Sequence, residues 1–90
     1  MKYPTFTDPN GVLQPFKGVT EGDRGKRVVA FVRKDEGEWQ HFGNSVSVDA
    51  MDKRVRGHER NGWRVSYCHI RLENQLTLKE IEDINKENNK

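Results

Sequence analysis

KRVVAFVRK, residues 26–34, has the composition of an inner β-strand. Its β-branched and aromatic residues stand between Gly25 and the turn-forming residues Asp35 to Gly37, a pattern that predicts a β-strand. The run from Val28 to Val32 is apolar on both alternating faces of such a strand. We therefore expect this strand to lie inside a sheet, with both of its faces covered.

Two further strands are expected beside it. EWQHF, residues 38–42, follows a short glycine-containing connection, which is the sequence signature of a β-hairpin. WRVSYCHIRL, residues 63–72, has alternating apolar residues whose parity switches near Tyr67 and Cys68. Either a β-bulge at these two residues or burial of both faces of the strand explains the switch.

A central amphipathic helix is expected over residues 48–61, between the second and third strands. Ser45 or Ser47 can cap its first turn, because a serine oxygen accepts hydrogen bonds from otherwise unpaired amides. Gly62 follows its last residue, where a helix commonly ends. The apolar face of this helix is formed by Val48, Met51 and Val55.

The remaining residues complete the expected domain. Thr77 to Glu80 form a capping box that opens a short helix ending near residue 84. Residues 1–25 contain all three prolines and are expected to form an extended N-terminal arm, and residues 85–90 a frayed polar tail. Residues 26–84 are then a single α+β domain. In it an antiparallel sheet of about three strands is packed by the central helix and a short C-terminal helix.

Composition excludes several classes of protein. Apolar residues make up 32% of the chain and charged residues 33%, and no apolar run approaches the roughly 20 residues of a membrane span. The opening residues Met1 to Pro4 do not resemble a signal peptide, and Cys68 is the only cysteine, so no intramolecular disulfide can form. We expect a cytoplasmic protein that does not enter a membrane.

Positive charge is concentrated in the middle of the chain. Residues 24–71 carry eleven Lys and Arg against six Asp and Glu, although the whole chain has a net charge of only +2. Cations gathered on one surface can bind phosphates or carboxylates. The candidate binding residues are three cations of the central helix and three strand arginines: Lys53, Arg56, Arg60, Arg64, Arg33 and Arg71. The alternative is a solvated helix face, partly neutralised by Asp49, Asp52 and Glu59.

Ring side chains are also expected on or beside the strands, at Trp39, His41, Phe42, Trp63 and Tyr67. Rings on a sheet surface can stack nucleic-acid bases when basic residues lie among them, and Arg33 and Arg71 are the charges placed for this. Core packing is the favoured interpretation, because a domain with so few aliphatic residues needs its aromatic rings inside.

The sequence contains no recognisable metal or catalytic site. His41, His58, His69 and Cys68 are potential zinc ligands, but their spacing does not match structural zinc sites. Cys68 can be drawn as a nucleophile with His41 or His58 as its base, yet a lone strand cysteine is more often a buried small hydrophobe. No phosphate-binding loop or hydrolase motif is present. We expect no enzyme activity, no cofactor and no bound metal.

These observations favour a non-enzymatic binding protein that covers a surface of a macromolecular partner, in the manner of a small regulator or inhibitor. A protein partner is expected, and the chain is expected to act as a homo-oligomer or in a complex. In general character the short, highly charged chain resembles accessory proteins of phages and other mobile elements. Two alternatives stay open: a nucleic-acid-binding module that uses the basic helix, and a binder of a small anionic ligand such as a nucleotide.

Overall fold

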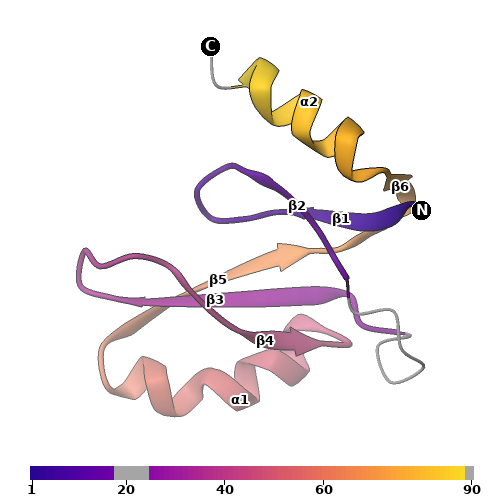
Figure 1. The fold of residues 1–90 in the computed structure, drawn as a ribbon. Helices are drawn as coiled ribbons and strands as arrows, with labels where there is room; N and C mark the ends of the chain where they lie inside the picture. Colours follow the sequence, from indigo (N-terminus) through magenta and orange to yellow (C-terminus); the bar gives the residue numbers. More distant parts are fainter. Residues whose placement is uncertain (18–24, 89–90) are drawn as a thin grey trace.

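The computed structural model describes residues 1–17 and 25–88. Along these residues the secondary-structure elements are β1 (Tyr3–Thr7), β2 (Leu13–Pro15), β3 (Val28–Lys34), β4 (Gln40–Ser45), α1 (Val48–Arg60), β5 (Trp63–His69), β6 (Arg71–Leu76) and α2 (Leu78–Asn88). They stack as α2, a first sheet, a second sheet and α1 (Figure 1). The fold is therefore of the α+β class, as the sequence predicts.

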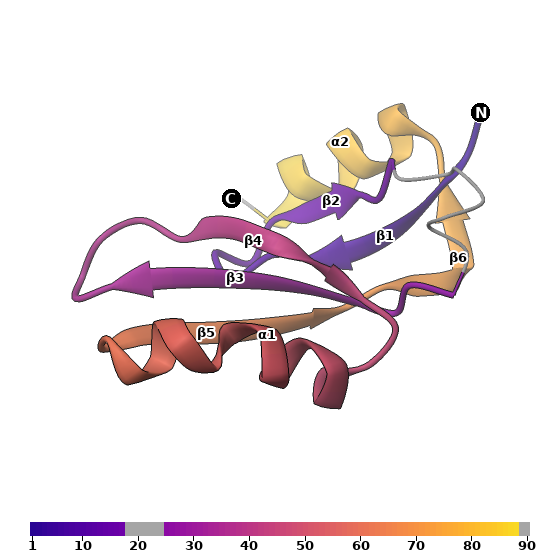
Figure 2. The same ribbon diagram turned by 90° about the horizontal axis from the view of Figure 1, so that it is seen from below.

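The second sheet, sheet B, has the strand order β4-β3-β5 and is antiparallel throughout. The predicted inner strand is its centre, and the predicted central helix is α1, which lies along one face of the sheet (Figure 2). Ser47 caps this helix, since its Oγ accepts a hydrogen bond from the Ala50 amide at 3.1 Å. Met51 and Val55 of α1 pack on Ala30 of β3, and all three are fully buried.

The opposite face of sheet B packs against the first sheet, sheet A, which consists of β2, β1 and β6. Val29 and Cys68 from sheet B form a core with Phe6, Phe16 and Ile70. The pairing of β3 with β5 runs without interruption along the whole of β5, so no bulge occurs near Cys68. The expectation of one strand over residues 63–72 is wrong, because the chain leaves sheet B after His69 and continues as β6 in sheet A. The parity switch marks a change of packing face: Val65 and Tyr67 pack toward α1, whereas Cys68, Ile70 and Leu72 pack between the sheets.

Sheet A corrects the expectation of an extended arm in residues 1–25. Its strand order is β2-β1-β6, so β1 and β2 form an antiparallel hairpin and β1 also pairs with β6. The prolines are tolerated because Pro4 lies where the β1–β6 register shifts, and Pro15 is the last residue of β2. Residues 18–24 of the expected arm lie outside the described residues. The protein thus has a second three-stranded sheet that the sequence analysis did not anticipate.

Helix α2 is longer than the sequence analysis expected. It extends to Asn88, beyond the expected end near residue 84, while residues 89–90 of the expected tail lie outside the described residues. The Asn85 side chain hydrogen-bonds to Leu13 of β2, which holds this last part of the helix against sheet A. Among the described residues, no helix combines the length and the apolar character needed to cross a membrane.

Candidate functional site

The three predicted helix cations share one exposed face of α1. Lys53, Arg56 and Arg60 are spaced by three and four residues, which aligns side chains along a helix. Arg56 pairs with Asp52 at 3.6 Å, and the same carboxylate accepts a hydrogen bond from the Tyr67 hydroxyl at 3.3 Å. The structure therefore brings these cations together as predicted, but ties Arg56 to an acidic neighbour.

Arg54 of α1, which the sequence analysis did not single out, has a structural role. Its guanidinium donates a hydrogen bond to the Asn44 carbonyl at 2.7 Å and lies over the Phe42 ring, 5.7 Å from the centroid. A Cβ atom on Gly43 would come within 2.9 Å of the same guanidinium. Arg54 thus fastens α1 to β4, and the glycine leaves room for it.

Arg33 and Arg64 come from different parts of the chain and face each other across sheet B. They are direct partners in the antiparallel pairing of β3 with β5, so their side chains project from the same face of the sheet. This is the face toward sheet A, because Val29 and Phe31 alternate with their neighbours onto it. Within the described residues neither arginine forms an ion pair.

Aromatic rings extend this pair into a surface. The Arg33 guanidinium lies 4.7 Å from the centre of the Trp39 ring, and the His41 ring meets Phe31 edge-on at 5.7 Å. We call Phe31, Arg33, Trp39, His41 and Arg64 the Arg33–Arg64 surface. It joins one end of β3, the start of β4 and the start of β5.

One polar atom of this surface has no partner. Arg33 Nε is buried, and no hydrogen bond reaches it. Beside it lies a hollow of about 420 Å³, whose rim includes Asn10 from the β1–β2 turn and both Glu36 and Glu38. The hollow thus combines the edge of a guanidinium with two carboxylates on the surrounding loop.

The remaining rings pack toward α1, so the five ring side chains are divided between two faces of sheet B. His58 lies edge-on between Phe42 and Trp63, with ring centres 5.0 and 5.6 Å away. Tyr67 packs against the same core, where burial raises the pKa of its hydroxyl and the carboxylate of Asp52 raises it further. These rings serve core packing, as the favoured interpretation expected.

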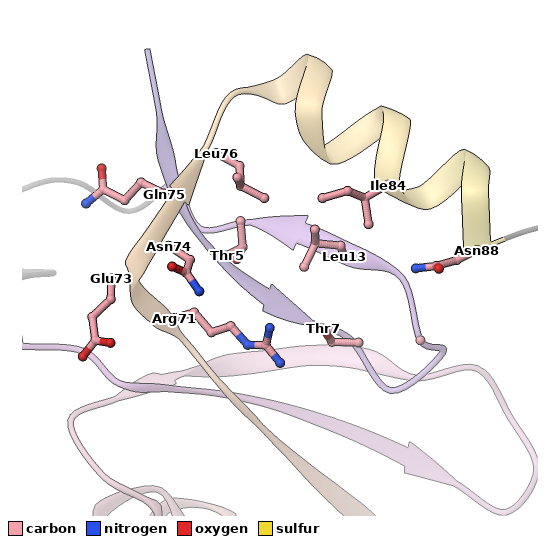
Figure 3. Close-up of a pocket in the computed structure, with 11 residues that line it drawn as sticks. Thr5, Thr7, Leu13, Arg71, Glu73, Asn74, Gln75, Leu76, Ile84 and Asn88 are labelled. Atoms are coloured by element: carbon pink, nitrogen blue, oxygen red, sulfur yellow. The ribbon is translucent and has the colours of Figure 1, made fainter.

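Arg71 stands apart from the other predicted site residues. It lies on β6 in sheet A, where it lines a groove between this sheet and α2 (Figure 3). The six candidate residues therefore occupy three places: the outer face of α1, one end of sheet B, and this groove.

The residues considered for metal binding and catalysis are dispersed. Within the described part of the chain, no three His, Cys, Asp or Glu residues are arranged to hold a metal ion. Cys68 is buried between the sheets, and burial raises the pKa of its thiol. A protonated, enclosed thiol is a poor nucleophile, so Cys68 serves packing in this structure.

The juxtaposition of Arg33 with Arg64 escaped the sequence analysis because it depends on strand register. Alternation alone puts each arginine on a face, but only the register decides which residues of β3 and β5 become partners. Matching the two residues that prove buried, Val29 and Cys68, places Arg33 opposite Arg64. No protein-family model, no curated protein and no solved structure matches this chain.

Proposed function

We propose that this chain is a non-enzymatic binding protein that covers a surface of a protein partner through the Arg33–Arg64 surface, as a small regulator or inhibitor does. The observation that carries the proposal is the direct pairing of Arg33 with Arg64. Like charges directly opposite each other destabilise a strand pair. Since this pairing does not help the fold, an acidic group of a partner is the natural complement of the two guanidinium groups.

Arg33 is suited to such a contact because its position is already restricted. The guanidinium lies over the Trp39 ring, and a side chain held by such a contact loses less conformational entropy on binding. Arginine and tryptophan are also the residue types enriched where protein interfaces gain most of their binding free energy. The surface therefore has the composition of an interface centre.

The charges around this surface favour a protein over a nucleic acid. Glu36 and Glu38 stand on the rim of the neighbouring hollow, where they would repel a run of phosphates. A protein partner can place one acidic side chain between the arginines and its own cations beside the glutamates. The net charge of +2 is likewise small for a protein that binds nucleic acid.

The sharpest test is the substitution Arg64→Glu. It replaces a like-charge pair by an opposite-charge pair across β3 and β5, so the variant should be more stable by about 0.2–1 kcal/mol. It should nevertheless fail to retain the partner that the unmodified chain captures from a lysate of its source cells. Arg60→Glu on α1 makes the same charge change away from this surface and should leave capture intact.

Two outcomes would contradict the proposal. Loss of capture with Arg60→Glu but not with Arg64→Glu would assign binding to the helix cations Lys53, Arg56 and Arg60. Binding of a fluorescent single-stranded oligonucleotide, falling steeply with salt, would assign the surface to nucleic acid, because phosphate contacts release counterions. Thermal unfolding of each variant shows whether it is folded.

A further inference from the structure

The groove between sheet A and α2 has a floor set by strand pairing. Thr5 is the partner of Arg71, and Thr7 is the partner of Leu13, so these four side chains share the outer face of sheet A. Ile84 of α2 lies above Leu13 and forms the opposite wall (Figure 3). The groove is partly open to solvent, and its volume of about 520 Å³ is within the range of about 300–1,000 Å³ typical of small-molecule sites.

The groove has an apolar end and a polar end. Leu13, Leu76 and Ile84 gather on one side, and all three remain only half-buried (Figure 3). The guanidinium of Arg71 and the side chain of Thr7 lie on the other side (Figure 3). An occupant that matches both ends is amphipathic, with an aliphatic body and a group that accepts hydrogen bonds.

The positive charge of Arg71 indicates which hydrogen-bond acceptor the ligand carries. Within the described residues Arg71 forms no ion pair and donates no hydrogen bond to another side chain, and the carboxylate of Glu73 points away from it (Figure 3). A guanidinium beside apolar surface favours a carboxylate, because the two can form paired, charge-assisted hydrogen bonds.

The walls of the groove are fixed before any ligand arrives. The Asn85 side chain donates a hydrogen bond to the Leu13 carbonyl at 3.0 Å and accepts one from the Leu13 amide at 2.9 Å. These two bonds hold α2 at a set distance from β2. A groove that is already formed loses little entropy on binding.

We propose that this groove binds a small organic acid, a monocarboxylate with a short branched aliphatic body. Arg71 pairs with the carboxylate, the Thr7 hydroxyl donates a hydrogen bond to it, and the aliphatic body packs on Leu13, Leu76 and Ile84. The site is separate from the Arg33–Arg64 surface, so it stands whether or not that surface binds a protein.

The test is a titration of the ¹⁵N-labelled chain with 4-methylpentanoate, followed by NMR. We expect saturable shifts of the backbone amides of Thr5, Thr7 and Leu13 and of the Arg71 Nε. The neutral amide 4-methylpentanamide should not produce these shifts, because it lacks the charge. Inorganic phosphate should not produce them either, because it lacks the aliphatic body.

Variants make the assignment specific. Arg71→Gln should weaken 4-methylpentanoate binding by about ten- to a hundredfold, the loss expected for a charge-assisted hydrogen bond. Thr7→Val should weaken it by a smaller factor, and Arg60→Gln, which alters an exposed arginine on α1, should leave it unchanged. A dispersed spectrum confirms that each variant is folded.

Four results would overturn the proposal. The first is the absence of shifts at millimolar 4-methylpentanoate. The second is equal binding of the amide or of phosphate, and the third is unchanged affinity in both Arg71→Gln and Thr7→Val. Shifts confined to Arg33, Trp39 and Arg64 would likewise move the binding site to the other end of the molecule.

Discussion

The side-chain amide of Asn85 pairs with the backbone of Leu13 in both directions, as a neighbouring β-strand would. Its Nδ2 donates to the Leu13 carbonyl and its Oδ1 accepts from the Leu13 amide. β2 is an outer strand of sheet A, so these groups lie on an edge that no other strand occupies within the described residues. An open sheet edge can pair with a strand of another molecule, and here a helix residue covers part of that edge.

Asn85→Ala should therefore loosen α2 from sheet A. Two hydrogen bonds are lost, so the free energy of unfolding should fall by about 1–3 kcal/mol. In hydrogen exchange, protection of the Leu13 amide should fall more than that of amides in β3. Glu87→Ala, on an exposed position of the same helix, should preserve both values; unchanged Leu13 protection in Asn85→Ala would contradict this role.

Met51→Ala should be among the most destabilising substitutions in the protein. The Met51 side chain is completely buried between α1 and sheet B, and truncation leaves a cavity there. We expect a loss of about 2–5 kcal/mol in urea unfolding. Val46→Ala changes a residue that is 54% exposed and should shift stability by less than about 0.5 kcal/mol. Similar losses at the two positions would count against this packing.

Tyr67 makes stability sensitive to alkaline pH. Burial and the Asp52 carboxylate raise the pKa of its hydroxyl in the folded chain. The stabilisation is complete below the ordinary tyrosine pKa of about 10 and is lost as pH rises through the folded value. Tyr67→Phe should flatten this decline. The phenolate absorbance of Tyr67, measured as the difference between wild type and Tyr67→Phe, should appear above pH 10. When Asp52→Asn is added to both proteins, this transition should move to lower pH.

Glu80 makes stability sensitive to acid. Its carboxylate accepts a hydrogen bond from the Thr77 amide at 3.0 Å, and hydrogen bonds from Thr77 lower the pKa of Glu80. The stabilisation is present above the ordinary glutamate pKa of about 4.3 and is lost as pH falls through the folded value. Wild type should exceed Glu80→Gln in stability at neutral pH, and the gap should close on acidification. A gap that does not vary with pH would exclude this linkage.

Cys68 should react slowly with thiol reagents in the native protein. The thiol is enclosed between the two sheets, and its raised pKa keeps it protonated at neutral pH. Labelling by a maleimide should therefore follow the fraction of unfolded chain across a urea titration. Fast labelling without denaturant would show that the space between the sheets opens readily.

The centre of the fold was predictable because its signals are local. The apolar run Val28–Val32 identifies the inner strand, and Met51 and Val55 identify the buried face of α1. The sequence offered Ser45 or Ser47 as the cap, and the structure selects Ser47. In each case neighbouring residues carry the pattern, so strand alternation or helical spacing suffices.

Sheet A was missed because its pairing joins distant residues. Pro4 and Pro15 make residues 1–25 look like an arm, and nothing near β1 in the sequence indicates that β6 completes its ladder. The grouping of the candidate arginines was missed for the same reason. Arg33 meets Arg64, and Arg71 meets Thr5, only through registers that tertiary packing selects.

The central place of β1 in sheet A has a consequence for biosynthesis. A ribosome releases the β1–β2 hairpin first, but one side of β1 stays without its ladder until residues 71–76 emerge. During that interval the same side can accept β6 from another nascent copy, which would yield an exchanged dimer. Slow translation between β2 and β6 would lengthen that interval, so expression rate should influence how much exchanged dimer forms.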